Sequence, residues 1–496
     1  MEIRRLPKTL DEFQQTAQTY NVIPVYAEIL ADMETPVSIL KRFYDQNDTC
    51  FLFESVEGGE KWARYSILGT SAAVEFKVYP DYIEVQDFSG NRVVPHNGQP
   101  LDTLRELHGH YKAYSAQYLP RFQGGLVGYL NYEMVSFLEP RLDYDFAPDT
   151  LLAHFVIPGE LIIFDSAHHT LFAIALAFKD AQPDTAAAFA DAQKRLDRLL
   201  GEITACISAN GHTNDQPAAY KLEPSLEPET FRQMVAQTID YIGQGEIIQG
   251  VISQPFFCDT PPDPFEFYRA QRYVNPSPYM FFVKLGEACL VGSSPETMVR
   301  LENGTATMRP IAGTRPRGLN EQEDLAYANA LLADEKEIAE HMMLVDLGRN
   351  DLGRVAEIGS VQVTELMTVE RYSHVMHLVS NVVCDLKENY DAFDLVKATF
   401  PAGTLSGAPK VRAMEIIKEL EPSMRGAYGG ALGYIAFSGN MDLAITIRTA
   451  AFENGRMRVQ AGGGVVADSL PENERQETIN KSKSLAKALE LLSRSE

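Results

Sequence analysis

Short segments of alternating apolar and polar residues, in both halves of the chain, constrain its fold most. Residues 51–84 alternate in this way and are rich in β-branched and aromatic side chains, which predicts strands joined by hairpins. Residues 124–133 are a further strand, whose glycines allow close backbone contact. Strands are also predicted around 250–257, 279–284 and 289–292. With helices between them, the pattern predicts a mixed α+β fold with large antiparallel sheets.

Segments with helical periodicity lie between these predicted strands. It predicts helices over residues 184–200, 228–243, 324–347, 408–420 and 471–493. Residues 208–228 are polar and hold several Pro, Gly and Asn residues, so we expect a linker there. Because 496 residues exceed a usual single core, we expect an N-terminal region 1–207 and a C-terminal region 229–496.

The charge of the chain excludes one large class of partners. The formal net charge is −24, with acidic residues spread along the chain and no basic stripe, which argues against nucleic-acid binding. The longest apolar runs are too short to span a bilayer, and the N-terminus does not have the pattern of a secretory signal. The five scattered cysteines fit reduced thiols, so we expect a cytosolic protein.

Two glycine-containing turns are candidate anion sites. In residues 308–317, MRPIAGTRPR, the small pair Ala312-Gly313 and Thr314 suit a tight turn that brings backbone amides up to an anion. Gly462, Gly463 and Gly464 precede two valines and offer amides in the same way. Turns of this kind are as often structural as functional.

Two pairs of glutamates share a helical spacing. Glu337 and Glu340 lie three residues apart, as do Glu474 and Glu477, and Lys481 follows one turn later. Either pair alone is typical of a solvated helix face. Two facing pairs without a His or Cys cluster suit Mg²⁺, which prefers oxygen ligands and keeps several waters.

Four further side chains have both a structural and a functional interpretation. Arg448 lies in the apolar alternation ITIRTA, where it needs either a structural salt bridge or a bound anion. Tyr428 in RGAYGG is either packing or a hydroxyl donor. His377 is either a satisfied core residue or an active-site group, and Glu296 is either a cap or an acid.

Together with SSPE (293–296), DLGRND (346–351), PAGTLSGAPK (401–410) and GGGVVADS (462–469), these motifs resemble the chorismate-utilising enzyme family. The pattern is most similar to the large subunits of anthranilate synthases, strongly over 249–481 and more loosely over 1–227. The resemblance implies large antiparallel sheets in a sandwich-like arrangement flanked by helices. It makes 229–496 the chorismate-binding catalytic region, and 1–207 the region that contributes a tryptophan regulatory site.

The resemblance also implies roles for individual residues. Glu296, as general acid, His377 and Thr404 correspond to catalytic positions. The implied chorismate-binding residues are Gly313, Thr314, Tyr428, Arg448, Gly462, Gly463, Gly464 and Lys481. Mg²⁺ would be bound by Glu340 and Glu477, supported by Glu337 and Glu474.

Two absent lysines indicate which reaction of the family this chain performs. Isochorismate synthases of the family carry a water-activating lysine at the place of Gln249, and aminodeoxychorismate synthases carry a nucleophilic lysine at the place of Ala312. Their absence implies direct attack of ammonia on chorismate to give anthranilate and pyruvate. Two alternatives stay open: component I of an aminodeoxychorismate synthase, and a non-catalytic tryptophan-sensing subunit. Since the chain has no glutaminase nucleophile motif, we expect a separate glutamine amidotransferase subunit, component II.

Two segments resemble the tryptophan-binding parts of the family, residues 51–66 and 275–282. They imply feedback inhibition by tryptophan. Glu54 would pair with its α-ammonium group, Ser55 would bond its polar groups, and the indole would lie against an apolar wall. The expected regulatory residues are Glu54, Ser55, Asn275, Pro278, Tyr279 and Met280. Because the segments lie more than 200 positions apart, they must meet across the packing of the two regions.

Overall fold

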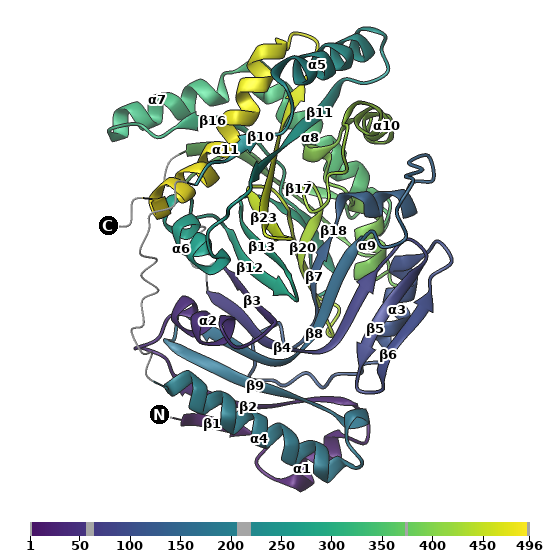
Figure 1. Ribbon diagram of the computed structural model, residues 1–496, viewed down its shortest axis with the longest axis vertical. Helices are drawn as coiled ribbons and strands as arrows, with labels where there is room; N and C mark the ends of the chain where they lie inside the picture. Colours follow the sequence, from purple (N-terminus) through teal and green to yellow (C-terminus); the bar gives the residue numbers. More distant parts are fainter. Residues whose placement is uncertain (1, 56–63, 206–219, 373–374, 494–496) are drawn as a thin grey trace.

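The computed structural model describes residues 2–55, 64–205, 220–372 and 375–493. Over these residues, strands β1 to β23 form one connected network in which the paired strands run antiparallel, and helices lie around it (Figure 1). The predicted α+β fold with large antiparallel sheets is therefore confirmed. Among the helices in this part of the chain, none is long and apolar enough to cross a membrane.

The strands and helices have the following bounds. The strands are β1 (Glu2–Leu6), β2 (Val22–Leu30), β3 (Thr49–Glu54), β4 (Tyr65–Val78), β5 (Tyr82–Asp87), β6 (Gly90–Pro95), β7 (Gly125–Leu130), β8 (Ala153–Asp165), β9 (Thr170–Phe178), β10 (Glu223–Pro224), β11 (Gln249–Cys258), β12 (Tyr279–Leu285), β13 (Ala288–Ser294), β14 (Thr297–Glu302), β15 (Thr305–Met308), β16 (Ile311–Pro316), β17 (Gln362–Arg371), β18 (Val375–Asp385), β19 (Gly407–Ala408), β20 (Ala431–Ala436), β21 (Met441–Ile445), β22 (Thr449–Glu453) and β23 (Arg456–Val465). The α-helices are α1 (Leu10–Thr16), α2 (Pro36–Tyr44), α3 (Pro100–Gly109), α4 (Thr185–Thr204), α5 (Pro228–Gly243), α6 (Pro264–Val274), α7 (Glu321–Leu332), α8 (Glu335–Gly353), α9 (Ala392–Thr399), α10 (Lys410–Leu420) and α11 (Pro471–Ser493), and the short 3₁₀ helices are η1 (Tyr132–Phe137), η2 (Lys179–Ala181) and η3 (Gly403–Leu405).

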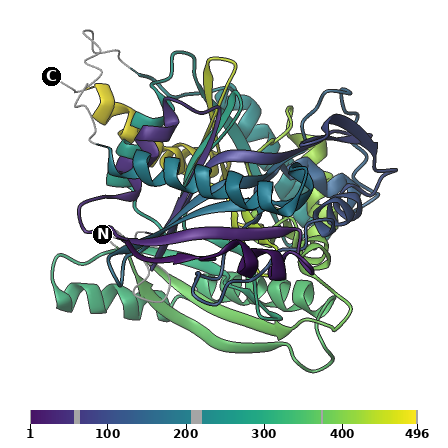
Figure 2. The same cartoon turned by 90° about the horizontal axis from the view of Figure 1, so that it is seen from below.

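One end of the molecule is built from the N-terminal strands. There β2 pairs with β9, β9 with β8, and β8 with β4, and α4 packs across β9 and β2 (Figures 1 and 2). Helix α4 begins at Asp184, whose side chain accepts a hydrogen bond from the Ala187 amide and caps the first turn. Its buried face carries Phe189, Leu196 and Leu199 into the core shared with β9.

Strand pairs join the two predicted regions of the chain. Strand β3 pairs with β12, which sets Glu54 opposite Met280, and β7 pairs with β20. The hydrophobic core clusters also draw residues from both regions, such as Phe51 and Phe281. The regions are thus packed on one another through hydrogen-bonded strands. Residues 208–219 of the predicted linker lie outside the described part. Strand β10 lies in the rest of the predicted linker and pairs with β11.

The predicted helices 228–243 and 471–493 coincide with α5 and α11, and helix 408–420 with α10 apart from its first residues. The single helix predicted over 324–347 is wrong, because α7 ends at Leu332 and α8 begins at Glu335. Asp334 causes the break. Its side chain accepts hydrogen bonds from the Lys336 and Glu337 amides at 3.1 and 3.2 Å and caps α8.

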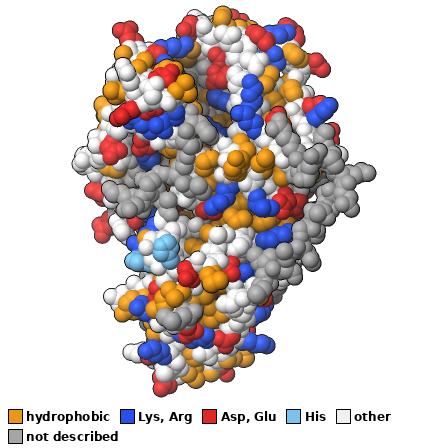
Figure 3. Space-filling view, turned by 90° about the vertical axis from the view of Figure 1, so that its left-hand side faces the viewer, with side chains coloured by type: hydrophobic (Ala, Val, Ile, Leu, Met, Phe, Trp, Pro, Cys, Tyr) orange, Lys and Arg blue, Asp and Glu red, His pale blue; other side chains and the backbone are white. Residues whose placement is uncertain are grey.

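Charged side chains of both signs share the molecular surface. Figure 3 shows acidic and basic side chains interspersed with apolar ones over the face that it presents. Near-surface ion pairs such as Arg232 with Glu472 contribute to this mixture. The negative net charge of the chain is therefore distributed over its surface, as the sequence predicts.

Candidate active site

Glu296 is a buried carboxylic acid between β13 and β14. Its carbonyl accepts a hydrogen bond of 3.0 Å from the Ile445 amide, which fixes the backbone, and the residue is 8% exposed. Burial raises the pKa of the Glu296 carboxyl to about 8, and the nearby Thr404 hydroxyl and the charges of Arg448 and Lys481 only partly oppose this. Oγ1 of Thr404 is buried and has no hydrogen-bond partner of normal geometry among the described residues. Glu296 is therefore protonated at neutral pH and can donate a proton.

Arg448 supplies an uncompensated positive charge next to this acid. Its backbone lies in the left-handed region at φ +49°, which costs of order 1–3 kcal/mol in a residue other than glycine. The Ser293 amide, at 3.2 Å from the Arg448 carbonyl, holds this conformation. Burial lowers the pKa of the guanidinium, and among the described residues it forms neither an ion pair nor a side-chain hydrogen bond. An arginine held in this way suits a bound anion.

The three glycines at the end of β23 let three functional side chains approach the backbone closely. A Cβ on Gly462 would lie 2.8 Å from the Tyr428 hydroxyl, on Gly463 2.8 Å from Oε2 of Glu474, and on Gly464 2.4 Å from Nε2 of Gln249. Each approach is closer than a real Cβ allows, so an alanine at any of the three positions would displace the neighbouring side chain. They bring Tyr428, Glu474 and Gln249 to one edge of the sheet.

Helices α8 and α11 present carboxylates to the same space. Oε1 of Glu340 accepts a hydrogen bond of 3.2 Å from Gln249, the side chain that touches Gly464. On α11, Glu474 and Glu477 both lie beside Gly463. The pKa of Lys336 is raised by its bond to Asp468 and, more weakly, by the charges of Glu340 and Glu474, so both carboxylates lie within electrostatic reach of this ammonium group.

Lys481 and Glu477 form an ion pair of 2.7 Å one helical turn apart on α11. The Lys481 ammonium also donates to the Gly462 carbonyl at 2.9 Å. Lys481 thus ties α11 to the glycine strand, and its charge reaches Glu296 as well. Of the four glutamates predicted by spacing, Glu337 pairs through Oε1 with Arg315 at 3.0 Å.

The turn around Gly313 lies against His377. Strand β16 carries a bulge between Ala312 and Thr314, and Gly313 takes the positive φ of +66° that this bulge requires. Nδ1 of His377 lies 2.9 Å from the Gly313 carbonyl and 3.1 Å from Oγ1 of Thr314. Because a carbonyl only accepts, Nδ1 carries the proton, and Nε2 is free to accept. Burial lowers the pKa of His377, which keeps the ring neutral.

These contacts bring the predicted active-site residues together in one region. The charge of Arg448 acts to lower the pKa of both Glu296 and His377, so Arg448 lies near both. The glycine strand is approached by Tyr428, Glu474, Glu477 and Lys481. Gly313 lies beside the Glu337 carboxylate, since a Cβ built on Gly313 would lie 3.1 Å from Oε2 of Glu337. The sequence analysis singled out Gln249 only because related enzymes have a lysine at this position. In the structure, its side chain donates a hydrogen bond to Glu340 and lies against Gly464. No sequence signal indicates this link, because it depends on the pairing of β11 with β23.

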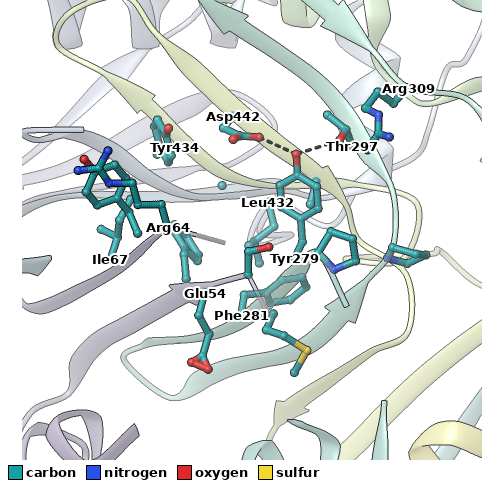
Figure 4. Close-up of a pocket in the computed structure, with 18 of the residues that line it drawn as sticks. Glu54, Arg64, Ile67, Tyr279, Phe281, Thr297, Arg309, Leu432, Tyr434 and Asp442 are labelled. Carbon is teal, nitrogen blue, oxygen red and sulfur yellow. Dashed lines mark hydrogen bonds between the residues drawn. The ribbon is translucent and has the colours of Figure 1, made fainter. Parts of the chain in front are cut away.

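A second candidate site is a cavity of about 980 Å³ whose lining includes residues of β3, β12 and β21. The predicted residues Glu54, Ser55, Pro278, Tyr279 and Met280 all line it. Figure 4 shows Tyr279 with its hydroxyl directed at Asp442 and Thr297, at 2.8 and 2.9 Å. The sequence analysis did not identify Asp442 or Thr297 as residues of this site. Thr297 directly follows the SSPE motif, and this position was the one available signal for it.

Glu54 is one of several charged residues that line this cavity. This carboxylate is 5% exposed and pairs with Arg272, and burial raises its pKa. Its Oε2 makes no hydrogen bond among the described residues. Asn275 lies outside the cavity lining, where its amide donates to Oγ of Ser293 at 3.0 Å. Residues 56–63 of the predicted segment 51–66 lie outside the described part.

Comparisons with known proteins give the family of this chain. The model of the chorismate binding enzyme family matches residues 50–487. Anthranilate synthase component 1 of Pseudomonas aeruginosa is 46% identical, over 97% of this chain and 98% of that protein. The crystal structure of anthranilate synthase component I from Streptococcus pneumoniae TIGR4 is similar with a TM-score of 0.75 at 38% identity, over 92% and 98% of the two chains. The menaquinone-specific isochorismate synthase of Escherichia coli shares the fold, with a TM-score of 0.72 at 18% identity over 98% and 99% of the chains. The chain belongs to the chorismate binding enzyme family, among relatives named anthranilate synthase component 1.

Proposed function

We propose that this chain is component 1 of an anthranilate synthase, which converts chorismate and ammonia to anthranilate and pyruvate in the first committed step of tryptophan synthesis. The observation that carries this proposal is the nearness of the buried, protonated Glu296 to the buried guanidinium of Arg448, which forms no ion pair among the described residues. A substrate that has both a carboxylate and a leaving hydroxyl group needs these two groups side by side. The relatives named anthranilate synthase component 1 support the same reaction.

Chorismate carries two carboxylates, and this chain offers a separate place for each. Arg448, the Tyr428 hydroxyl and the Gly464 amide bind the enolpyruvyl carboxylate in our proposal. Tyr428 suits this role because burial raises its pKa and keeps the hydroxyl a donor. Gly313 and Thr314 lie near the ring, and Lys481 adds positive charge on the other side of the glycine strand.

The ring carboxylate would be held through Mg²⁺, bound by Glu340 and Glu477 with Glu474 and Glu337 in support. One buried oxygen fits this role: Oε2 of Glu474 has no hydrogen-bond partner among the described residues. Mg²⁺ is commonly bound through one or two carboxylates while it keeps waters and substrate groups, so Glu340 and Glu477 would be sufficient protein ligands in this proposal. Mg²⁺ bound there would withdraw charge from the ring carboxylate and make C2 more electrophilic.

The reaction proceeds in two steps in this proposal. Ammonia forms a bond to C2, the ring double bonds shift, and the C4–O bond breaks as Glu296 protonates the departing hydroxide to water. The new C2 ammonium group then loses one proton to solvent, and the Glu296 carboxylate regains one from solvent. The proton on C2 then leaves, the C3–O bond breaks, and the enolpyruvyl group takes up a proton at its methylene carbon to depart as pyruvate. His377, held neutral with Nε2 free, orients the substrate at the pyruvyl-bearing edge.

Ala312 and Gln249 select ammonia as the nucleophile. Ala312 lies on β16 opposite Leu378 and offers no amine for a covalent adduct at C2. Gln249 is engaged with Glu340 and, as an amide, cannot act as a general base toward water. Direct attack by ammonia therefore remains for this site.

We infer that the ammonia comes from a glutamine amidotransferase subunit, component II. The component 1 naming of the relatives supports a partner component. Isolated chain should then turn over with ammonium salts and not with glutamine alone. We place the enzyme in the cytosol, which is supported by the four described cysteines, all buried free thiols.

We further infer that the cavity between β3 and β12 binds tryptophan as a feedback inhibitor. Glu54 has a buried oxygen without a hydrogen bond that suits an α-ammonium group, and Ser55 lies beside it. Pro278, Tyr279 and Met280 give the apolar wall for an indole. Asn275 acts indirectly here, by bracing Ser293.

The proposed function is tested by supplying chorismate, Mg²⁺ and ammonium to the purified chain, with and without tryptophan. Anthranilate fluorescence and an equal amount of pyruvate are expected, and tryptophan should suppress both. Accumulation of an aminodeoxy intermediate without anthranilate would favour the aminodeoxychorismate synthase alternative. Tryptophan binding without any turnover would favour the sensing subunit.

A further inference from the structure

A buried arginine that the sequence analysis did not single out lies directly behind the proposed chorismate site. Arg425 follows α10 and is 2% exposed. Its Nε and Nη2 donate to the two carboxylate oxygens of Glu421 at 2.8 and 2.7 Å, in the fork geometry that only a guanidinium offers. Such a fully buried pair requires further partners to offset its desolvation.

Two carbonyl groups provide those partners, and both belong to segments of the active site. Nη1 donates to the Leu405 carbonyl at 2.6 Å, next to Thr404, and Nη2 donates to the Val251 carbonyl at 2.7 Å. Val251 pairs with Gly464 across β11 and β23. The guanidinium is therefore fixed in place by the backbone on two sides of the substrate region.

The free face of this guanidinium lies over aromatic rings. Its central carbon is 5.6 Å from the Tyr428 ring centroid and 4.6 Å from that of Tyr132. Tyr428 directs its hydroxyl at Gly462, where a Cβ would lie 2.8 Å away. A cation at this distance both holds the ring and draws electron density from it, which makes the phenol a stronger hydrogen-bond donor.

The anchors of Arg425 are themselves held firmly. Oε1 of Glu421 accepts from the Ser253 amide and hydroxyl, each at 2.8 Å. The Arg425 amide donates to Oε1 of the buried Glu133 at 2.6 Å, and the Gly426 amide donates to its Oε2 at 3.1 Å. Neither the guanidinium nor the backbone of Arg425 can shift without breaking these bonds.

We propose that Arg425 is a positioning residue for chorismate, which holds and polarises Tyr428 so that its hydroxyl binds the enolpyruvyl carboxylate. This inference rests on the proposed function, because it assigns Arg425 to the hold on the substrate of that reaction. Arg425 acts through Tyr428 and does not touch the substrate. It should therefore affect the binding of chorismate and leave the proton transfer from Glu296 largely alone.

The test is a cycle of Arg425→Lys, Tyr428→Phe and the double variant, with chorismate varied at saturating ammonium and Mg²⁺. Lysine keeps the charge opposite Glu421 but loses the fork and the flat face over Tyr428. Arg425→Lys should raise KM for chorismate about tenfold and change kcat by less than about threefold. In the Tyr428→Phe background, the same substitution should change KM by less than about threefold, because the group it acts through is gone.

A merely structural role predicts a different result. Loss of folded protein lowers apparent kcat and leaves KM unchanged, so an unchanged KM in folded Arg425→Lys overturns the proposal, as does an equal rise in both backgrounds. Arg42→Lys is the matched control, since Arg42 also bonds a carbonyl and Glu34 in a partly buried setting on α2. It should leave KM for chorismate at the wild-type value.

Two measurements keep the outcome decisive. If Arg425→Lys does not fold, Glu421→Gln leaves the guanidinium in place with a weaker anchor, and should raise KM about threefold only where Tyr428 is present. Titration calorimetry of chorismate without ammonium gives Kd independently of turnover. Wild type that binds chorismate but forms no anthranilate contradicts the proposed function alone, and the effect of Arg425→Lys on Kd then decides this inference.

Discussion

The hydroxyl of Tyr279 lies 2.9 Å from Oγ1 of Thr297, the residue that follows Glu296 in the chain. Since the Tyr279 hydroxyl donates its proton to Asp442 at 2.8 Å, the Thr297 hydroxyl is the donor in the 2.9 Å bond to Tyr279 (Figure 4). One wall residue of the proposed tryptophan cavity is thus hydrogen-bonded to the neighbour of the proposed general acid. In the proposed function, this contact would couple an occupant of the cavity to the general acid.

The first prediction concerns the pH dependence of turnover. Glu296 must be protonated to expel the hydroxide, and its pKa of about 8 places the loss of activity on the alkaline side. Glu296→Gln should lower kcat by about 10²-fold or more and abolish the alkaline limb of the kcat profile. Glu302→Gln, on strand β14, is the control and should keep the limb. A wild-type profile that is flat from pH 7 to 9 would remove Glu296 from this role.

The same raised pKa has a consequence for stability. The folded protein holds the Glu296 proton more tightly than the unfolded chain, so the favourable contribution is full below pH 4.5 and is lost as pH rises through about 8. Relative to Glu296→Gln, wild type should lose about 3 kcal/mol of unfolding free energy between pH 5 and pH 8. Urea unfolding of both proteins at the two pH values measures this difference, and parallel values would contradict it.

The active-site turn gives the second prediction. A lysine in place of Ala312 restores the amine that aminodeoxychorismate synthases use, so Ala312→Lys should reduce anthranilate formation at least about tenfold and allow a covalent adduct with chorismate. Mass spectrometry of the intact protein and product fluorescence measure the two effects. Ala312→Met fills similar space without a nucleophile and should give no adduct. An unchanged product pattern in Ala312→Lys would show that this position does not determine the mechanism.

Much of the fold follows from local sequence patterns, whereas the break between α7 and α8 was not predicted. Residues 228–243 and 471–493 have strong periodicity and clear ends, and both helices were predicted to the residue. Asp334 and Glu337 have the D-x-x-E spacing that is typical of a helix N-terminus, and the prediction of one helix over 324–347 did not use it. In the structure the Asp334 side chain caps α8.

Sequence motifs identify most residues of the candidate site, but they do not predict the contacts between those residues. Arg448, Tyr428 and the glycines come from motifs, but their assembly depends on strand pairs between distant segments, such as β11 with β23. Gln249 and Arg425 carry no motif of their own. Their roles come from hydrogen bonds to backbone and carboxylate groups that only the folded chain brings near.

The third prediction tests the close approach at the glycine strand. A Cβ on Gly464 would lie 2.4 Å from Nε2 of Gln249, so Gly464→Ala must push this side chain away from Glu340. The kcat/KM for chorismate should fall by about 10²-fold, since displacements of this size misplace a substrate site. Gly353→Ala is the control, because a Cβ there meets nothing within 4 Å. Equal activity of the two variants would contradict the role of this approach.

The fourth prediction concerns Mg²⁺. Glu340→Gln removes one negative charge from the proposed ligand set, so the Mg²⁺ concentration for half-maximal activity should rise at least about tenfold. Glu335→Gln, exposed at the start of the same helix, changes the charge of α8 equally and should leave this concentration unchanged. The measurement is a Mg²⁺ titration of anthranilate formation after chelation. A normal requirement in Glu340→Gln would exclude it as a ligand.

The fifth prediction concerns the regulatory cavity. Ser55 and Glu54 line one end of it, at the end of strand β3, so Ser55→Phe places an aromatic ring where tryptophan should lie and removes a hydroxyl that can bond its polar groups. The tryptophan concentration for half-inhibition should rise at least about tenfold, since one blocked polar contact and a steric overlap each cost more than about 1 kcal/mol. Each variant is compared with itself, as the ratio of anthranilate formation with and without tryptophan. Ser55→Thr keeps the hydroxyl with little added bulk and should stay close to wild type. Full tryptophan inhibition in Ser55→Phe would place the regulatory site elsewhere, whatever the size of the cavity.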